Sequence, residues 1–267
     1  MKLLLILISL LIQLSCAGDK KEDINTSFHG ADSNNKTEDL LFDMICNTPE
    51  NPESLFFYGF SPLYSDTGIE DGVIMESAFE SVMLFHDIDV NYFGIYLESG
   101  TPRPVISRKL FIETGVLNKE NIKEKLKLRY NFRNRNISAA LFEMGKNDLK
   151  SSVPEQLYHF PEIEISVREK NPSWINLLPQ IKGYNFSIGV SGRYSQISES
   201  IRQADLNAIE EMLKQKSISV VSKSDKGNYG TNGTEYSQSA INGFYIIRRW
   251  WDKDMRNYYS LGVSPGN

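Results

Sequence analysis

The pattern of apolar and polar positions gives the chain a short apolar start, a polar stretch and a long region of alternating segments. Leu3 to Leu14 form an apolar run that only Ser9 and Gln13 interrupt, and Met1-Lys2 puts a positive charge before it. The run is too short for a membrane span, which needs about 20 apolar residues. This layout is typical of a secretory signal, and we expect residues 1–15 to be a cleaved signal peptide.

The apolar run closes on Gln13-Leu14-Ser15-Cys16, where a small residue stands directly before a cysteine. This string resembles the lipobox of bacterial lipoproteins, although Gln13 stands where the usual pattern has Leu. The resemblance implies a covalent lipid on Cys16 and cleavage before it, and several acyl chains are enough for stable membrane anchoring. The alternative is cleavage after Ala17 in an ordinary secreted protein, which leaves the cysteine unexplained.

From Ala17 to Pro49 the chain is polar and acidic. Such a composition buries too little apolar surface to fold by itself, so residues 16–49 are predicted to be an acidic flexible tether. Leu40-Leu41-Phe42 and Met44-Ile45-Cys46 depart from this character. We expect them to dock on the first domain as a short helical turn.

The alternating region repeats itself. Gly59–Ser65 (GFSPLYS) aligns with Gly189–Ser195 (GVSGRYS) at an offset of 189 − 59 = 130, and the register continues without a gap to Val90 and Val220. A fixed period of this kind indicates duplicated structural units. Each copy opens with an apolar, aromatic-rich segment that predicts a strand, Leu55–Phe60 in one and Tyr184–Val190 in the other.

A helix is predicted after each opening strand. In the first copy Thr67-Gly68-Ile69-Glu70 fits a capping box at the helix start. Apolar residues at helical spacing then form one stripe per copy; these are Ile74, Ala78, Val82 and Phe85 in the first, and Ile201, Ala204, Ala208 and Met212 in the second.

Short apolar or alternating segments after each helix predict strands, namely Ile88–Leu97, Val105–Ile112, Ile137–Phe142, Ile218–Val221, Phe244–Trp251 and Tyr258–Val263. Between them the copies differ, with a short helix expected over Asn118–Leu128 and a Gly- and Asn-rich loop over Asp225–Thr234. One helical stripe among several strands needs a sheet face to cover it. The predicted fold is therefore α+β, with two tandem domains, each one long helix packed on a small, mainly antiparallel sheet.

The predicted domains are residues 50–148 and 172–267, and the prolines of residues 149–171 favour an extended linker. Tyr184–Val221, followed by Phe244–Trp251 and Tyr258–Val263, resembles the LPP-twenty family of small outer-membrane lipoproteins. The resemblance implies a helix-on-sheet α+β fold, relatives in the envelope and among flagellar outer-membrane components, and no catalytic residues.

The net charge and the cysteine content limit which partners and which cysteine sites the chain can have. The net charge of −5 and the pI near 5.4 argue against a general affinity for nucleic acid or anionic lipid. With Cys16 lipidated, Cys46 has no cysteine to pair with, so a disulfide framework and a cysteine metal site are both excluded. Cys46 is then either a packed small hydrophobe or a free thiol.

Residue types that carry chemistry are scattered, and structural roles explain them. The three histidines lack metal-ligand spacing, the serines near the strand ends fit turn or capping hydroxyls, and the spaced glycines fit a hairpin loop better than a phosphate loop. Paired acids fit a solvated surface. These residues are His29, His86 and His159; Ser61 and Ser191; Gly227, Gly230 and Gly233; and Glu210, Glu211, Asp252 and Asp254.

Arg248-Arg249-Trp250-Trp251 is the most distinctive string in the chain. Strand alternation puts Arg248 and Trp250 on one face and Arg249 and Trp251 on the other, so one tryptophan is expected in the core. The other could serve an interaction surface, since Trp and Arg dominate interface hot spots. The alternative is a core strand with ordinary edge protection.

These features favour a non-enzymatic envelope lipoprotein, facing the periplasm from the outer membrane, whose domains act as structural or protein-interaction modules. Its expected partners are the membrane, through the lipid, and envelope proteins or a second copy; no cofactor besides the lipid on Cys16, no metal and no nucleic acid are expected. One alternative is a ligand-binding lipoprotein with a small-molecule or glycan site between the domains. Another is a hydrolase whose site the sequence does not reveal.

The lipid anchor can be tested by Cys16→Ala. Because the thiol is the attachment atom, we expect the variant to lose incorporation of radiolabelled palmitate and to leave the detergent phase for the aqueous phase in Triton X-114 partitioning. Cys46→Ala is the matched control and should label and partition like the parent. If Cys16→Ala partitions unchanged, the anchor is not at this residue.

Overall fold

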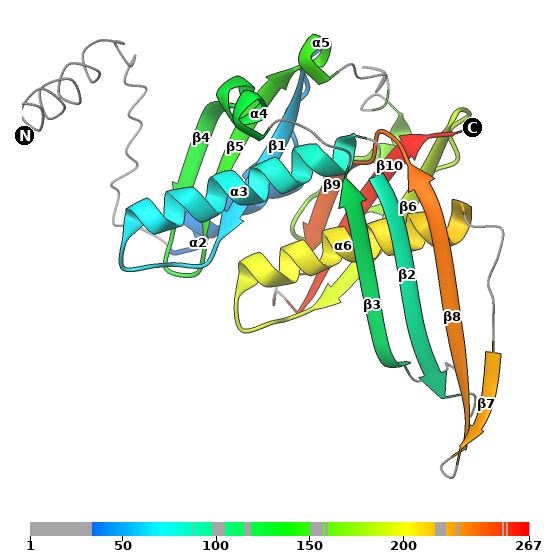
Figure 1. The fold of residues 1–267 in the computed structure, drawn as a ribbon. Coiled ribbons are helices and arrows are strands. Elements are labelled where there is room, and N and C mark those ends of the chain that lie inside the picture. Colours follow the sequence, from blue (N-terminus) through cyan, green and yellow to red (C-terminus); the bar gives the residue numbers. More distant parts are fainter. Residues whose placement is uncertain are drawn as a thin grey trace, which may run out of the picture. The chain divides into compact units, whose positions relative to one another are not determined.

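The computed structural model describes residues 34–86, 88–97, 105–114, 119–149, 157, 160–216, 223–227, 230–252, 254 and 256–266. Residues 34–267 form one compact unit. Its elements are mixed helices and antiparallel strands, so the predicted α+β class is confirmed (Figure 1). The predicted signal peptide and the lipid-bearing Cys16 lie outside the described residues.

The first part of the chain contains α2 (Asn34–Cys46), β1 (Ser54–Ser61), α3 (Thr67–Phe85), β2 (Ile88–Leu97), β3 (Val105–Thr114), α4 (Lys119–Lys125), β4 (Lys127–Arg133), β5 (Ser138–Gly145) and α5 (Lys146–Leu149). Two short 3₁₀ helices follow, η2 (Pro161–Ile163) and η3 (Ser173–Ile175). The last part contains β6 (Tyr184–Gly192), α6 (Ile197–Lys216), β7 (Lys223–Gly227), β8 (Gly230–Ile241), β9 (Tyr245–Trp251) and β10 (Asn257–Pro265).

The 130-residue offset found in the sequence is kept by the folded chain. β1 and β6 begin 184 − 54 = 130 residues apart, and α3 and α6 begin 197 − 67 = 130 residues apart. We call β1–β5 with α3 the first repeat and β6–β10 with α6 the second repeat. In each, the last strand lies between the first and the fourth, giving the orders β1-β5-β4 and β6-β10-β9.

Each long helix packs on its sheet through the predicted stripe, whose eight members are all buried. The closest approach lies at equivalent glycines. A Cβ on Gly59 would stand 2.1 Å from the carbonyl oxygen of Ile74, and a Cβ on Gly189 would stand 1.9 Å from that of Ala204. Since 204 − 74 is again 130, the same contact is made twice, and only glycine lets the helix lie so near the strand.

A third sheet joins the two repeats. Its order is β3-β2-β8-β7, and β2 pairs antiparallel with β8 from Ile88↔Ile241 to Leu97↔Asn232. β2 is the second strand of the first repeat, whereas β8 is the third strand of the second. Because the repeats share this sheet, their division into two separate domains stays a prediction.

The predicted tether is too long. Residues 34–46 form α2, and Leu41, Phe42, Ile45 and Cys46 are buried. The expected short helical turn is a helix of 13 residues, and it contacts β9 of the second repeat as well as β1 of the first. Burying these apolar side chains lowers the free energy of the folded chain. The helix therefore forms although the flanking residues are polar.

Local signals were wrong at three places. The helix cap of α3 is Asp66, whose carboxylate accepts from the amide of Gly68 at 2.8 Å, so the capping box was placed one residue late. Most of the predicted loop over Asp225–Thr234 is strand, in β7 and β8, although its glycines do belong to a hairpin, in which Gly227 pairs with Gly230. β4 was not predicted because Lys127–Arg133 is rich in charge; its strand structure comes from pairing with β5. The predicted strand at 218–221 lies outside the described residues.

Gly189→Ala tests the close approach of α6 and β6. The added methyl meets backbone atoms of α6, which cannot move without shifting the helix, so we expect a loss of about 3 kcal/mol in the free energy of unfolding. Gly72→Ala in α3 is the matched control. Nothing lies within 4 Å of its Cβ position, and the change should stabilise by about 0.5–1 kcal/mol. Urea unfolding followed by circular dichroism measures both; equal effects would contradict the packing described.

Candidate functional site at the junction of the two repeats

The four residues of the Arg-Arg-Trp-Trp string are all buried, with exposed fractions of 1–4%. The possible interaction surface on these residues is therefore not exposed, and the alternative of a core strand fits their burial. Trp251 packs edge-on against Phe42 of α2 with ring centroids 4.9 Å apart, and the indole of Trp250 donates to the carbonyl of Val167 at 2.9 Å. Both faces are covered because α2 and the segment between the repeats fold over the strand.

The two repeats meet at a junction, formed by β1 and α3 of the first repeat and by β9 and α6 of the second. Arg249 is its central residue. Its Nε and Nη2 donate to the two carboxylate oxygens of Asp205 in α6, at 3.1 and 2.9 Å. Ser260 of β10 also donates to Asp205, at 2.5 Å. A forked guanidinium and a carboxylate match in this geometry, which makes the pair stronger than a point contact. Burial lowers the pKa of Arg249, but Asp205 outweighs it and holds that pKa above its usual value.

The guanidinium of Arg249 also lies over two aromatic rings of β1. Its central carbon is 5.1 Å from the ring centre of Tyr58 and 5.5 Å from that of Phe60. A cation over a ring face is attracted by the ring quadrupole, and the attraction grows when water is excluded. The Arg249 side chain of the second repeat therefore binds α6 of its own repeat and also packs on β1 of the first repeat.

A second aromatic contact lies beside it. The hydroxyl of Tyr245 in β9 donates to the carbonyl of Phe56 in β1 at 2.9 Å. The Tyr245 ring stands edge-on to Phe57 and Phe85, at 5.9 and 6.4 Å. These aromatic contacts also belong to the junction of β1 and α3 with β9 and α6.

Polar side chains tie α2 and the segment between the repeats to the junction. Asn47 exchanges two hydrogen bonds with the backbone of Ser166, at 3.0 and 2.9 Å. The Ser166 hydroxyl donates to the carbonyl of Arg249 at 2.7 Å, and Arg248 donates to the carbonyl of Thr48 at 3.3 Å. These bonds satisfy polar groups that would be costly to bury alone.

Cys46 lies in the same region and is fully buried. Burial raises the pKa of its thiol well above the usual value, although Arg249 acts in the opposite direction. A thiol in this state is a poor nucleophile, because the thiolate is the reactive form. The interpretation of Cys46 as a packed small hydrophobe is therefore the one that the fold supports.

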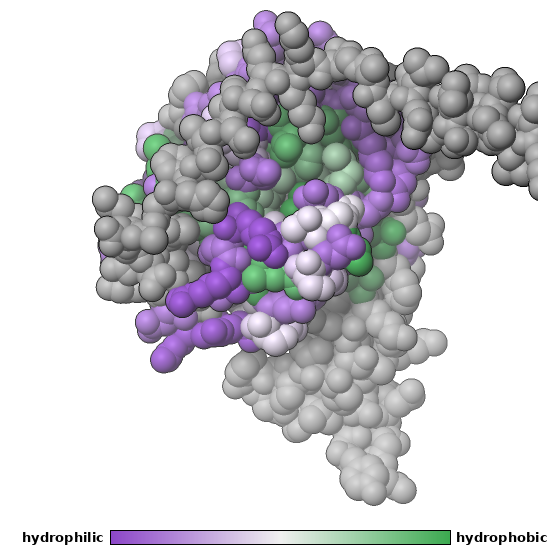
Figure 2. Space-filling model, turned by 90° about the vertical axis from the view of Figure 1, so that its left-hand side faces the viewer, coloured by the Kyte–Doolittle hydropathy of each residue, from purple (hydrophilic) through white to green (hydrophobic). Residues whose placement is uncertain are grey.

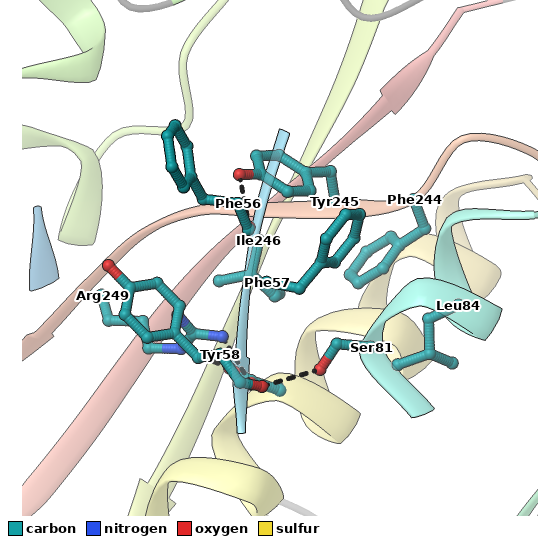
Figure 3. Close-up of a pocket in the computed structure, with 10 residues that line it drawn as sticks. Phe56, Phe57, Tyr58, Ser81, Leu84, Phe244, Tyr245, Ile246 and Arg249 are labelled. Carbon is teal, nitrogen blue, oxygen red and sulfur yellow. Dashed lines mark hydrogen bonds and ion pairs between the residues drawn. The ribbon is translucent and has the colours of Figure 1, made fainter. Parts of the chain in front are cut away.

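A small cavity of about 30 Å³ lies inside the junction (Figure 3). Arg249, Asp205, Ser81 and several aromatic residues line it, and in Figure 3 Tyr245 and Phe57 lie on one side of β1 while Arg249 and Tyr58 lie on the other. Such a space suits one or two water molecules. Small-molecule sites usually measure about 300–1,000 Å³, so this cavity is not the ligand groove that the alternative function requires.

The remaining candidate residues have structural roles where they are described. The hydroxyls of Ser61 and Ser191 donate to the carbonyls of the next residues, at 2.7 and 3.0 Å, as expected for turn hydroxyls. His86 ends α3, and His29 and His159 lie outside the described residues. Glu210 is buried and bound to Lys214 at 2.8 Å, so its predicted solvated position was wrong.

Within the described residues, no group of three or more metal-binding side chains occurs. The helices described there include none that is both long and apolar enough to cross a membrane.

No protein-family model, no curated protein and no solved structure matches this chain. The resemblance to the LPP-twenty family therefore stays a prediction.

Asp205 and Tyr58 were missed by the sequence analysis. A signal existed for the first, because Asp205 lies beside Ala204 and Ala208 on the apolar stripe of α6, where a carboxylate needs a cation. No local signal marked Tyr58, whose contact with Arg249 joins segments 191 residues apart in the chain (249 − 58).

Arg249→Met tests the junction. It leaves the carboxylate of Asp205, only 14% exposed, without its cation, and we expect a loss of about 3 kcal/mol in the free energy of unfolding. The double variant Arg249→Met with Asp205→Leu should recover much of this loss, because no charge is left to bury. Arg256→Gln is the control: its partner contact with Asp254 is exposed at both ends, and such pairs contribute at most about 1 kcal/mol. Equal losses for Arg249→Met and Arg256→Gln would contradict the role of Arg249.

Proposed function

We propose that this protein is a lipid-anchored bacterial envelope lipoprotein, held at the periplasmic face of the outer membrane through Cys16, that acts as a non-enzymatic structural or protein-interaction module. Its place would be in outer-membrane or flagellar assembly, in line with the resemblance to the LPP-twenty family. The observation that carries the proposal is the exposed edge strand β4.

β4 is the outer strand of its sheet and is exposed along most of its length. Two large side chains on it face solvent, Leu128 with 55% of its surface exposed and Tyr130 with 61%. Sheet edges are common sites for partner proteins. Aromatic residues in such positions are enriched among interface hot spots.

Two ion pairs hold β4 rigidly. Arg129 binds the buried carboxylate of Glu143 on β5, and Arg133 binds that of Glu70 on α3 at 2.9 Å. Burial raises the pKa of both acids, but hydrogen bonds from Arg133 and from the Tyr64 amide outweigh it at Glu70, and both acids have a pKa below the usual value. The arginines thus serve the fold, and a strand that is already ordered loses little entropy when it binds.

Figure 2 faces the side of the molecule on which β4 lies. Hydrophobic residues gather there in a hollow, and hydrophilic residues border it. An apolar centre with a polar rim is the usual anatomy of a protein interface.

A photo-crosslinking amino acid at position 130 tests the proposal in living cells. We expect the probe to trap an envelope protein or a second copy, identified by mass spectrometry. The same probe at Asp254, which is exposed on the turn between β9 and β10, is the matched control and should trap nothing. No specific product at position 130 would count against an interaction role through β4.

Deletion of the gene separates the two assembly roles. A flagellar role requires a loss of swimming motility, measured in soft agar, whereas a general envelope role requires increased sensitivity to detergent and vancomycin. Complementation with the parent gene and with its Cys16→Ala variant supplies the control for anchoring. If neither phenotype changes, the proposed function is wrong.

A further inference from the structure

The junction joins unlike surfaces of two like repeats. The first repeat contributes the edge of β1 and the adjoining face of α3, whereas the second contributes the edge of β9 and the adjoining face of α6. By the repeat, β6 is the counterpart of β1, and β4 is the counterpart of β9. Each repeat therefore has one edge in the junction and the other edge outside it.

The equivalence of β4 and β9 holds residue by residue. Gly59 pairs with Ala140, which pairs with Asn131 of β4; Gly189 pairs with Ser260, which pairs with Arg249 of β9. Each strand carries an irregularity two residues before this position, where Arg129 in β4 and Ile247 in β9 have no partner in the register. A shared bulge in a shared register indicates the same strand used twice.

The helices show that the repeats are related by a shift in one direction. Figure 1 shows α3 and α6 running the same way, and Arg202 of α6 contacts Glu80 of α3 at 3.7 Å. The counterpart of Arg202 in the first repeat is residue 72 (202 − 130), so the two helices are offset by eight residues (80 − 72). Such an arrangement is heterologous, and a heterologous contact can be repeated by a further unit.

The free edges differ from their buried counterparts in exposure. β9 is buried almost throughout, whereas β4 is exposed at Leu128 and Tyr130. At the other end, Phe60 of β1 is 7% exposed under Arg249, but its counterpart Val190 of β6 is 45% exposed. Apolar side chains are thus left open at the two edges that the junction does not use.

We propose that a second copy of this chain binds head to tail, with the β4 edge of one molecule against the β6 edge and α6 of the next. This contact repeats the internal junction between chains. It deepens the proposed interaction role, on which it rests, by naming the partner as the chain itself.

The charges of β4 are compatible with this contact. β1 and β9 belong to different sheets and meet through side chains, so the charged residues that protect β4 from backbone pairing do not block it. Lys127 stands where β9 has Tyr245, and Glu211 stands where α3 has Ser81; Tyr245 and Ser81 line the same cavity. In the proposed contact Lys127 of one molecule therefore lies near Glu211 of the next, and Glu211 has 46% of its side chain exposed.

The first test is zero-length carbodiimide cross-linking of the full-length, detergent-extracted protein, prepared as an equimolar mixture of ¹⁴N and ¹⁵N material. We expect a cross-link between Lys127 and Glu211 that carries both isotopes, which identifies it as intermolecular. It should disappear with Glu211→Gln. A cross-link with only one isotope, or none, would overturn the proposal.

The second test uses the polarity of the contact. Leu128→Asp disables the β4 edge and Val190→Asp the β6 edge, so each variant alone should sediment as a monomer in analytical ultracentrifugation. Their equimolar mixture should give dimers and nothing larger. The Leu128→Asp variant keeps an intact β6 edge and the Val190→Asp variant keeps an intact β4 edge, so each molecule can bind one partner only. Leu177→Asp, at a site 75% exposed outside both edges, should associate like the parent, and all variants should melt like it.

Other outcomes are equally informative. Loss of association with only one of the two edge variants, and no rescue on mixing, indicates a symmetric contact and overturns the head-to-tail arrangement. A parent protein that stays monomeric, while the probe at position 130 still traps another envelope protein in cells, overturns this inference and leaves the proposed function standing. If the parent protein stays monomeric and the probe at position 130 also traps nothing in cells, both the head-to-tail contact and the proposed interaction role are wrong.

Discussion

The ion pair between Arg249 and Asp205 is the interaction on which the junction of the two repeats depends. A guanidinium is expensive to bury, and at Arg249 the cost is offset because a carboxylate meets it in a forked geometry and two aromatic rings cover it. The pair fixes β9 against its own helix, and the rings of β1 then fix one repeat against the other. The remaining contacts of the junction fill the space around this arrangement.

Duplication produces two equivalent strands, β4 and β9, and the fold exposes the first and buries the second. β9 is covered and carries Tyr245, Ile247 and Trp251, whereas β4 is exposed and carries Lys127, Arg129 and Arg133 at the equivalent positions. The difference is a matter of place, because the first repeat has its neighbour on the β1 side and the second has its neighbour on the β9 side. A repeated unit with a direction always leaves one such edge at each end.

The segments outside the repeats complete the core. α2 and the residues between the repeats cover β9 from both faces, and Asn47, Ser166 and Arg249 link the three segments by hydrogen bonds. The chain that follows the predicted lipid site therefore enters the folded unit at its central junction.

The sequence by itself determined the 130-residue repeat, the two helical stripes, most strands and the α+β class, because each of these follows from spacing between neighbours along the chain. Only the tertiary structure decided that β2 pairs with β8, that Asp205 receives Arg249, and that β9 is buried while β4 is exposed. Those outcomes depend on which surfaces meet after folding, because the partners lie 44 residues apart for Asp205 and Arg249 and at least 135 apart (232 − 97) for β2 and β8. Local periodicity gives each strand its two faces, but the neighbour that covers a face comes from elsewhere in the fold.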